Sequence, residues 1–555
     1  MSAEFHKNLQ ILANAGSGKT HTLITRILTL LSMGKDPSKI IALTFTRNAA
    51  GEFLTKILLR LAAASASEEE AEKLSKQTGY TKSCGEYLEQ LKLLLSQLDK
   101  LQLTTLDSFF SKVVGAFPQE LGLVDQPKLL DPSAEELTGA RTLRKALRKL
   151  KTKSPADFHL VADSFLQMDE GSARRSLTSR LDSFRKEAHS ELLEYPEGDF
   201  WGNEARIWPT GSPFRKLTEA ELEVCRQTLL AEQPDPPFTT DAAKAWRIMT
   251  NLVPGAKGNI ITAQIITNLH DWKNGVAELS YKNKSYSIST VSQKAAAAIV
   301  ENYLHRSVDY RAREAKAIFR LLEIHEEEYA AEIRARGVLT FSDITNLLQP
   351  SEAFDADRLM IDERLDTQFD HWLLDEFQDT SRSQYRALAN LLQEVISSTE
   401  DRSFFCVGDI KQAIYGWRGG DARLFKEILG HYNKHGKLIH DLPLSESWRS
   451  SQTVLDALNI TFSTIPSYCG IPKEARRRWK EGWNDHSRSP LAKPLEGYFE
   501  WKVVEKGEDS GENVQEEVIT LLTGVKEKLA QGMTVALLVR SGEDARRWLD
   551  IRSEE

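Results

Sequence analysis

The segment ANAGSGKT, residues 13–20, constrains the fold more than any other part of the sequence. An apolar run (LQILA) precedes it, and a run with 3.6-residue apolar spacing (THTLITRILTLL) follows, which predicts a strand, a tight turn and a helix. Gly16 and Gly18 permit positive φ, so successive backbone N–H groups can point at one anion. Lys19 adds a point charge, and Thr20 adds a hydroxyl for a divalent cation. A glycine turn without a ligand is the alternative, and the strand–loop–helix setting favours a phosphate-binding loop.

Further strands and helices alternate around this loop. IIALTF and LQLTTLDS are predicted strands, and NAAGEFLTKILLRLAA is a predicted helix. Strand patterns return much later, at HWLLDEF and SFFCVGD. The alternation predicts an α/β fold with a parallel sheet that is interrupted by a long insertion and then resumes.

The chain therefore divides into three parts. Residues 1–115 and 336–431 form a split α/β domain, and residues 116–335 form a helical insertion. Residues 432–555 form a further domain with a helix after Trp448, a basic loop at 474–490 and two late strands, GYFEWKVVE and TVALLVR. The last helix of the insertion is predicted to end at Gly337 and to carry one apolar face, made of Ile318, Leu321, Leu322, Tyr329 and Ile333.

Composition narrows the class of protein. A chain of 555 residues is too long for one core, and 27% charged with 41% hydrophobic residues is an ordinary globular balance. No apolar run is long enough to span a bilayer, so we expect no membrane association. The four cysteines are scattered, which fits a reducing cytosol and excludes a local zinc site: Cys84, Cys225, Cys406 and Cys469. With a net charge of −8, any nucleic-acid binding must come from local patches.

Two adjacent carboxylates stand at the end of the predicted strand HWLL. Burying Asp375 and Glu376 together is costly unless a cation or hydrogen-bond donors compensate. Asp375 is a candidate Mg²⁺ contact, and Glu376 is a candidate general base for an attacking water. An acidic turn is the alternative, and the combination with Lys19 and Thr20 disfavours it.

A third strand end carries polar and aromatic groups, in VGDIKQAIYGWRGGD. Gln412 could sense a terminal phosphate by hydrogen bonding. Tyr415 and Trp417, beside Arg418, lie in a glycine-flanked stretch and could stack on nucleobases. Packing of these rings into a core is the alternative, and the glycines at 416, 419 and 420 favour an exposed loop.

These motifs occur in an order that resembles one known family. ANAGSGKT, IALTFTRNAAGEF, TTLDSFF, LLDEFQDTS, VGDIKQAIYGWRGGD and SESWRSS resemble the motif series of UvrD-like superfamily 1 DNA helicases. GVLTFSDITNLL, KQAIYGWRG and WRSS are similar to the RecB and AddA branch, the helicase-nuclease subunits of exonuclease V and its relatives. The resemblance implies a P-loop NTPase with a RecA-like motor domain, a large helical insertion and a partial second RecA-like domain. It also implies ATP and Mg²⁺ as cofactors, and it implies two partners, DNA and the second subunit of a helicase-nuclease.

Residue roles follow from the same resemblance. The catalytic set is Glu376, Asp375, Lys19, Gln412 and Arg449. The nucleotide-binding set is Ala13, Asn14, Ala15, Gly16, Ser17, Gly18, Lys19, Thr20, His21, Trp448 and Arg449, with Thr20 and Asp375 at Mg²⁺. The DNA-binding set is Thr44, Phe45, Thr46, Ser108, Tyr415, Trp417 and Arg418.

Three departures from the family pattern bear on activity. Asp107 stands where the family usually has His, and Ser447 stands where it usually has Asn. The family's later motifs, including a second phosphate-sensing arginine, would lie beyond Glu555. Because an arginine finger is worth about 10³–10⁵ in rate, we expect this chain to bind nucleotide, to hydrolyse it poorly and not to unwind DNA.

Two basic stretches in the insertion are candidate duplex-binding surfaces. RTLRKALRKLKTK places leucines on one face and seven basic side chains elsewhere: Arg141, Arg144, Lys145, Arg148, Lys149, Lys151 and Lys153. ARRSLTSRLDSFRK repeats the pattern with Leu177, Leu181 and Phe184. Solvated helix faces without a partner are the alternative.

The sequence thus predicts the N-terminal part of an ATP-dependent DNA helicase, 3′→5′ by resemblance. It would act in a helicase-nuclease that processes double-strand breaks during recombinational DNA repair in the bacterial cytosol. A non-hydrolysing protein that binds ATP and DNA is the alternative. A nucleotide kinase or GTPase would explain only the phosphate loop, not DEFQDTS or the tryptophan–arginine loop.

Overall fold

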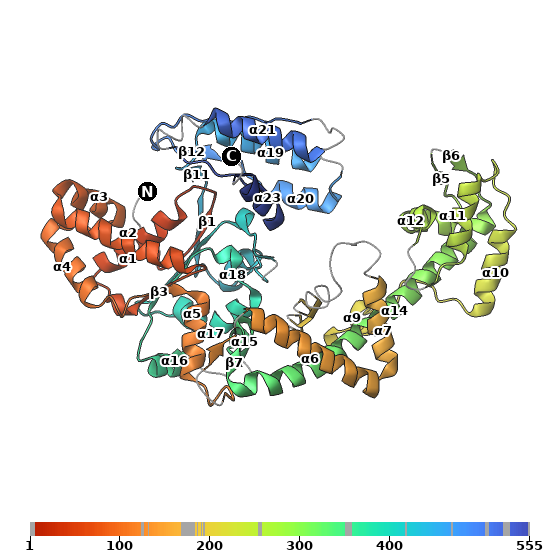
Figure 1. The fold of residues 1–555 in the computed structure, drawn as a ribbon, viewed down its shortest axis with the longest axis horizontal. Coiled ribbons are helices and arrows are strands. Elements are labelled where there is room, and N and C mark those ends of the chain that lie inside the picture. The colour runs from red at the N-terminus through yellow and green to blue at the C-terminus, as the bar shows by residue number, and fades with distance from the viewer. Residues whose placement is uncertain are drawn as a thin grey trace. The chain divides into compact units, whose positions relative to one another are not determined.

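A computed structural model describes most of the chain. The described residues are 6–123, 127–130, 132–167, 184–185, 187–189, 191–192, 195–253, 258–282, 284–349, 358–416, 419–467, 470–504, 510–525 and 533–552. They divide into two compact units, residues 1–444 and 445–555 (Figure 1). No helix among the described residues is long and apolar enough to cross a bilayer.

The first unit is mixed α/β, built on a six-stranded sheet. Its strands are β1 (Asn8–Ala13), β2 (Ile40–Thr44), β3 (Gln102–Thr105), β8 (His371–Leu374), β9 (Ser403–Gly408) and β10 (His440–Leu444). Their order is β10-β1-β9-β8-β2-β3, and every neighbouring pair is parallel. The predicted strands and the parallel sheet are confirmed. Strand β10, which pairs with β1, extends this sheet beyond residue 431.

The sheet separates two apolar cores because neighbouring side chains along a strand point to opposite faces. Ile41 and Leu43 of β2 pack into one core, and Ile40 and Ala42 pack into the other. The first core is covered by α5 (Leu106–Ala116), α15 (Phe341–Leu347), α16 (Arg358–Leu365), α17 (Arg382–Ser397) and α18 (Leu424–Tyr432). The second is covered by α1 (Lys19–Ser32), α2 (Arg47–Ala66), α3 (Glu68–Thr78) and α4 (Cys84–Ser96).

The insertion between α5 and β8 is organised along one long helix, α14 (Thr290–Glu332). The predicted helix before Gly337 is its C-terminal part. A short 3₁₀ turn follows α14, and Gly337 ends it with φ 68°, as its C-cap position predicted. Leu321, Leu322 and Tyr329 are buried, as predicted.

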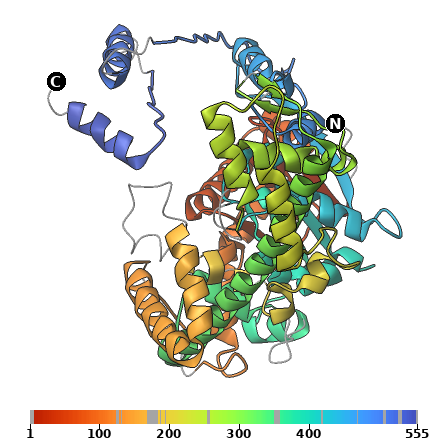
Figure 2. The same cartoon turned by 90° about the vertical axis from the view of Figure 1, so that its right-hand side faces the viewer.

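Two helical clusters pack on different parts of α14. Helices α6 (Pro132–Lys153) and α7 (Pro155–Gln167) lie along its C-terminal half (Figure 2). There, Leu143 and Leu150 pack in one cluster with Leu321 and Ile324. The other cluster covers its N-terminal part near Ala296 and Val300. That cluster comprises α10 (Glu219–Leu230), α11 (Thr240–Thr250), α12 (Ile260–Thr267), α13 (Leu269–Asn274), β5 (Leu279–Tyr281) and β6 (Lys284–Tyr286). Most of the second predicted basic stretch, around Leu177 and Leu181, lies outside the described residues.

The second unit differs from its sequence-based prediction in two places. Helix α19 (Gln452–Ser463) follows Trp448 as expected. The predicted basic loop, however, contains helix α20 (Lys473–Gly482). Within it, Arg477 bonds Glu474 and Glu481 at helical spacing, and its Ala, Arg, Lys and Glu residues favour a helix.

The two late strands are the second difference. Residues 497–504 and 533–539 form no strand, because a strand needs a ladder partner and the described residues supply none to either segment. Their apolar side chains are accordingly exposed, Trp501 by 77% and Leu538 by 93%. The described strands of this unit are β11 (Glu446–Ser447) and β12 (Ser487–Arg488), which pair with each other, and its remaining described helices are α21 (Ser510–Gly524) and α23 (Gly542–Arg552).

Candidate nucleotide site

The glycine-rich loop joins β1 to α1 at the carboxyl edge of the sheet. Gly16 and Gly18 have φ of 71° and 92°, values that residues with a Cβ rarely adopt. Helix α1 begins at Lys19, directly after Gly18. Both Lys19 and Thr20 therefore lie in the first turn of a helix, whose free N–H groups and dipole favour an anion. His21 follows on the exposed side of the same turn.

Lys19 meets the acidic pair at the end of β8. Its Nζ lies 2.7 Å from Oε2 of Glu376. The Lys19 side chain is 11% exposed and the Glu376 side chain 37%, so solvent reaches the carboxylate more than the ammonium. Glu376 itself has φ 47°, a left-handed backbone that costs energy for a residue with a side chain. Parallel pairing of β1, β9 and β8 brings these two predicted residues together across 357 positions of sequence.

Asp375 has the electrostatics of a cation ligand. Burial, and then the neighbouring charge of Glu376, raise the pKa of Asp375 to about 7. Its Oδ1 is enclosed and has no hydrogen-bond partner among the described residues. A buried, uncompensated carboxylate oxygen beside a phosphate-binding loop fits Mg²⁺, which prefers oxygen ligands and keeps several waters.

Asp379 shares this character. Burial, and then the charge of Glu376, raise the pKa of its carboxyl, and its Oδ1 also lacks a partner among the described residues. The described residues contain no group of three or more His, Cys, Asp or Glu side chains that could hold a metal ion. A cation here would therefore need phosphate oxygens and water molecules as further ligands, in addition to the protein oxygens.

The end of β9 adds a second polar segment next to the loop. Gln412 Nε2 donates to Asp409 Oδ2 (2.8 Å), and the Lys411 backbone N–H donates to Asp409 Oδ1 (2.9 Å). Lys411 Nζ donates to Oδ1 of Asn14 in the glycine-rich loop (2.5 Å). Burial lowers the pKa of Lys411. Gln412 therefore directly follows Lys411, the residue that contacts the loop.

The predicted DNA-binding residues are partly brought together. The rings of Phe45 and Tyr415 lie 4.9 Å apart between centroids and are tilted by 32°. Both are half-buried, so the pair presents an aromatic surface near the ends of β2 and β9. Trp417 and Arg418 lie outside the described residues.

The predicted hydroxyl contacts are engaged in local structure. Thr44 is 2% exposed and its Oγ1 donates to the Thr46 carbonyl (2.9 Å). Thr46 Oγ1 caps α2 by accepting from the Ala49 N–H, and Ser108 Oγ lies 2.7 Å from Thr105 Oγ1. Asp107, where the family usually has His, accepts from Gln384 Nε2 at 3.3 Å.

Trp448 and Arg449 belong to the second unit. Trp448 is 50% exposed, and Arg449 is exposed. The Arg449 backbone N–H donates to Oγ of Ser447 (3.4 Å), the residue that replaces the family's Asn.

Sequence reasoning missed three residues of this site: Gln378, Asp379 and Lys411. Gln378 is 1% exposed and bonds to both strand ends. The signal was present, since DEFQD places an amide between three carboxylates, and a buried amide among carboxylates has to donate to them.

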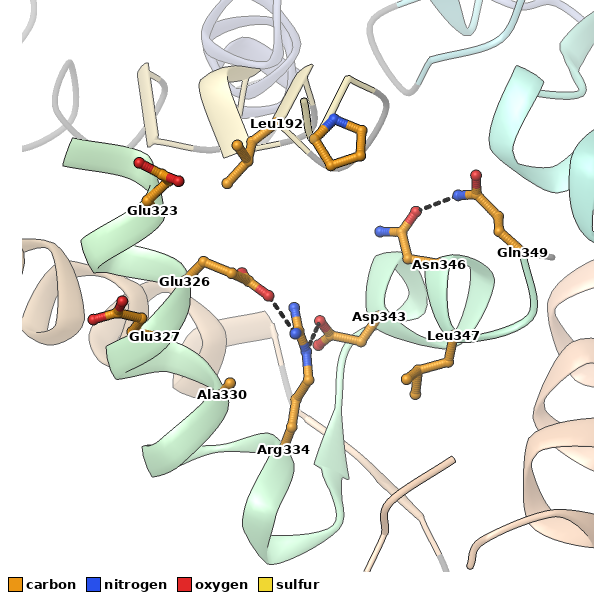
Figure 3. A pocket seen from close by; sticks show the side chains of 11 residues that line it. Leu192, Glu323, Glu326, Glu327, Ala330, Arg334, Asp343, Asn346, Leu347 and Gln349 are labelled. Carbon is orange, nitrogen blue, oxygen red and sulfur yellow. Dashed lines mark hydrogen bonds and ion pairs between the residues drawn. The ribbon is translucent and has the colours of Figure 1, made fainter. Parts of the chain in front are cut away.

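A cavity of about 620 Å³ lies elsewhere, at the junction of α14 with α15 (Figure 3). Arg334 stands between Glu326 and Asp343 and bonds both, with its Nε 2.9 Å from Asp343 Oδ1. Although burial acts to raise it, the hydrogen bond with His189 and the charge of Arg334 hold the pKa of Glu326 at about 2. Tyr329 OH also donates to Asp343 (2.9 Å). Asp343, from GVLTFSDITNLL, thus anchors the insertion to the α/β core, and none of the predicted site residues lines this cavity.

A strand, a glycine-rich loop with a helix N-terminus, and acidic strand ends across a parallel sheet are typical of P-loop nucleotide-binding proteins. A family model for the UvrD/REP helicase N-terminal domain matches residues 1–433, and the chain belongs to this family.

Curated relatives agree with this family. The chain is 25% identical over 500 residues to a protein of Streptococcus sanguinis that is named as the A subunit of an ATP-dependent helicase/nuclease, covering 83% of this chain and 38% of the relative. Proteins of the same name from Streptococcus mutans and Listeria monocytogenes are 26% and 24% identical, each over 82% of this chain and 38% of the relative. The chain therefore spans little more than a third of the length of these relatives.

Proposed function

We propose that this chain is the ATP-binding motor part of a DNA helicase. The observation that carries the proposal is the contact of Lys19 with Glu376, beside the enclosed, unpartnered oxygen of Asp375. A lysine at a helix N-terminus and two carboxylates at the end of β8, separated from β1 by β9, are what nucleoside triphosphate hydrolysis needs: charge for the phosphates, an oxygen for the cation and a base for water.

Each residue has a task in that reaction. Backbone N–H groups of residues 16–20 bind the phosphates, and Lys19 neutralises their charge. Thr20 and Asp375 would hold Mg²⁺, which would supply positive charge against the charge that develops on the phosphate oxygens. Glu376 orients the attacking water and accepts its proton. Gln412 bonds the terminal phosphate, while Trp448 stacks on adenine and Arg449 contacts the γ-phosphate from the second motor domain.

The DNA track follows from the same edge of the sheet. Phe45 and Tyr415 stack on bases of a single strand. Trp417 and Arg418, which lie outside the described residues, are assigned by resemblance to the same DNA contact. Thr46 and Ser108, with the backbone near Thr44, contact the sugar–phosphate chain. Stacking tolerates any base, which suits a motor that moves along DNA regardless of sequence.

The wider proposal concerns the whole protein. Residues 1–115 and 336–431 form a RecA-like first motor domain, 116–335 an inserted arm that meets duplex DNA, and 432–555 part of a second motor domain. The relatives' name supports a helicase-nuclease of the exonuclease V kind that acts with a second subunit. Movement 3′→5′ and a role in double-strand-break repair in the bacterial cytosol complete the proposal.

A second candidate function is a subunit that binds ATP and DNA without turnover. Lys19, Asp375 and Glu376, the proposed nucleotide contacts, all lie in the first unit, whereas Arg449 lies in the second. Motor action needs two domains that close and reopen around nucleotide.

The test measures two quantities on the full chain. One is the affinity for a fluorescent ATP analogue with Mg²⁺, and the other is ATP hydrolysis with and without single-stranded oligo(dT). We expect nucleotide binding that Lys19→Ala abolishes and that Lys76→Ala, a surface lysine in an ion pair with Glu72, leaves unchanged. DNA-stimulated hydrolysis would establish the motor, and binding without hydrolysis would establish the second candidate. Equal nucleotide binding by Lys19→Ala would refute both.

A further inference from the structure

Gln378 occupies the centre of the candidate site, although neither the cation nor the phosphate argument uses it. It lies in the 3₁₀ turn Phe377–Asp379 after β8 and is 1% exposed. Its Nε2 donates to Glu376 Oε2 (2.7 Å) and to Asp379 Oδ2 (3.2 Å). Its Oε1 accepts the backbone N–H of Asp409 (2.9 Å), at the end of the neighbouring strand. One buried amide therefore joins the ends of β8 and β9.

The surroundings allow this amide only one orientation. Turning it over would place Oε1 against the carboxylates of Glu376 and Asp379, and would place the NH₂ against the Asp409 N–H. The space is also filled on the far side, since a Cβ on Gly408 would come within 2.4 Å of Gln378 Oε1. A side chain at 408 would displace the amide, which explains the glycine at this position.

The contacts of Gln378 belong to a closed ring of hydrogen bonds that begins and ends in the glycine-rich loop. On one side, Lys19 bonds Glu376, which accepts from Gln378. On the other, Gln378 accepts from the Asp409 N–H, and the Asp409 carboxylate accepts from the Lys411 N–H. Lys411 Nζ then returns to Asn14 in the loop.

Two neighbouring groups are linked to this ring. Gln412 bonds Asp409 Oδ2. The segment that carries Tyr415 is held against the turn that carries Gln378, because the Asp421 N–H donates to the Thr380 carbonyl (3.0 Å). Gln378 is thus linked to Gln412 through Asp409, and it lies in the turn that the Tyr415 segment contacts.

The arrangement changes when a triphosphate enters the loop. Lys19 and Gln378 donate to the same oxygen, Oε2 of Glu376. A phosphate carries more negative charge than a carboxylate and would draw the Lys19 ammonium toward itself. Among the described residues, Gln378 is then the hydrogen-bond donor that remains on Glu376. With Lys19 withdrawn, the bond from Gln378 is what holds the direction of the Glu376 carboxylate.

We propose that Gln378 is a positioning residue that holds Glu376 in place once nucleotide has taken Lys19 away, and that it links this change to the segments bearing Gln412 and Tyr415. The inference rests on the proposed function, because it assumes that a triphosphate binds at Lys19. It assigns to one amide both the alignment of the base and the coupling between nucleotide and DNA.

The test compares Gln378→Met, which keeps the volume and removes the hydrogen bonds, with the wild-type chain. Gln393→Glu is the control for Gln378→Glu, since Gln393 is exposed on the following helix α17. Three measurements are made on each full-length chain. The first is the affinity for a fluorescent ATP analogue in the presence of Mg²⁺, and the second is kcat and KM for ATP in the presence of oligo(dT). The third is the change in oligo(dT) affinity that the analogue causes.

We expect Gln378→Met to bind nucleotide within about twofold of wild type and to lose at least about tenfold in kcat with KM unchanged, as the loss of an aligned base predicts. The analogue should no longer change oligo(dT) affinity. If Gln378→Met fails to fold, Gln378→Glu takes its place in the test. This variant replaces the amide donors by an acceptor and is expected to give the same three results. If the wild-type chain binds nucleotide without hydrolysing it, kcat cannot be compared. The change in oligo(dT) affinity is then the measurement that tests the role of Gln378.

The outcomes separate the two levels of the argument. A wild-type chain that does not bind nucleotide refutes the proposed function. Nucleotide binding in all chains, with kcat and oligo(dT) coupling in both Gln378 variants like those of wild type, overturns only the role of Gln378. A fall in nucleotide affinity as large as the fall in kcat would also overturn it, since that pattern indicates loss of the whole site.

Discussion

Two regions of the first unit, the carboxyl edge of the sheet and helix α6, contain the same types of charged residue but differ in whether these charges are paired. At the sheet edge, four carboxylates (Asp375, Glu376, Asp379 and Asp409) gather around two lysines, and oxygens of Asp375 and Asp379 stay enclosed without a partner among the described residues. On α6, by contrast, Arg141, Lys145 and Lys149 already pair with Glu328 and Glu332 of α14.

The difference teaches how to separate a ligand site from a packing contact. Carboxylate charge that is buried and left uncompensated has to be offset by positive charge from outside the chain, and here a cation fits. Charge that is neutralised across two helices stabilises their packing and leaves little for a partner. Only Arg144, Arg148, Lys151 and Lys153 of the predicted basic stretch have no ion-pair partner within the described residues.

The largest expected effect tests the uncompensated charge. Asp375→Asn should remove the Mg²⁺ dependence of nucleotide binding and lower any ATP hydrolysis at least about a hundredfold. The reason is that a neutral amide binds a cation much more weakly than a carboxylate does. The measurement is nucleotide affinity with and without Mg²⁺, with the exposed Asp99→Asn as control. Retention of the Mg²⁺ dependence would show that the cation does not use Asp375.

The same variant has a signature without ligand. Since the pKa of Asp375 is raised to about 7 in the fold, the folded chain holds this proton more tightly than the unfolded chain. The free energy of unfolding should therefore fall as pH rises from about 4 to about 7, by roughly 1–3 kcal/mol. Asp375→Asn should lose this part of the pH dependence and be more stable than wild type at pH 8. Urea unfolding at several pH values measures it.

A smaller effect tests the aromatic pair. Tyr415→Ala should weaken oligo(dT) binding by roughly 1–2 kcal/mol, about five- to thirtyfold, because one stacking surface is lost. The salt dependence should stay as in wild type, since no charge changes. Fluorescence anisotropy at several salt concentrations tests both, with Tyr498→Ala, 77% exposed in the second unit, as control. An unchanged affinity would leave Tyr415 a packing residue of its loop.

The next effect tests the unpaired face of α6. Exchanging Arg144, Arg148 and Lys151 for Gln should weaken duplex binding several-fold and reduce the slope of log affinity against log salt by up to about 3. Binding of a duplex end is measured across salt concentrations. An unchanged slope would exclude this face from DNA binding.

The smallest effect completes the comparison. Exchanging Arg141, Lys145 and Lys149 for Gln should leave that salt slope unchanged, because Glu328 and Glu332 already neutralise these side chains. The melting temperature should fall by only a few degrees, as surface ion pairs contribute little. A slope reduced as much as in the preceding variant would mean that DNA displaces the glutamates.

The sequence anticipated those parts of the fold whose determinants are local. Strands β1, β2, β8 and β9 end where apolar runs meet polar residues, and Gly337 ends the 3₁₀ turn that follows α14, close to the predicted helix end. The contact of Lys19 with Glu376 followed from motif order, because parallel strands bring their carboxyl ends to one edge.

What the sequence could not supply depends on distant pairing. The role of Gln378 requires that β8 and β9 be neighbours, so that the Asp409 N–H meets an amide 31 residues earlier. Helix α14 begins at Thr290, well before the amphipathic stretch that predicted it, because its N-terminal part is buried within a cluster of other helices. Residues 497–504 and 533–539 have strand-like composition, yet strand formation is decided by a partner.

The length of α14 has a mechanical consequence. At 1.5 Å per residue, its 43 residues extend for roughly 65 Å along one axis. Its C-terminal end is bonded to the α/β core through Arg334, Tyr329 and Asp343. Separate helical clusters pack against its N-terminal and C-terminal parts. A rotation of about 5° at the Gly337 turn would therefore sweep the opposite tip through roughly 6 Å, which makes the helix a lever that enlarges small movements at its fulcrum.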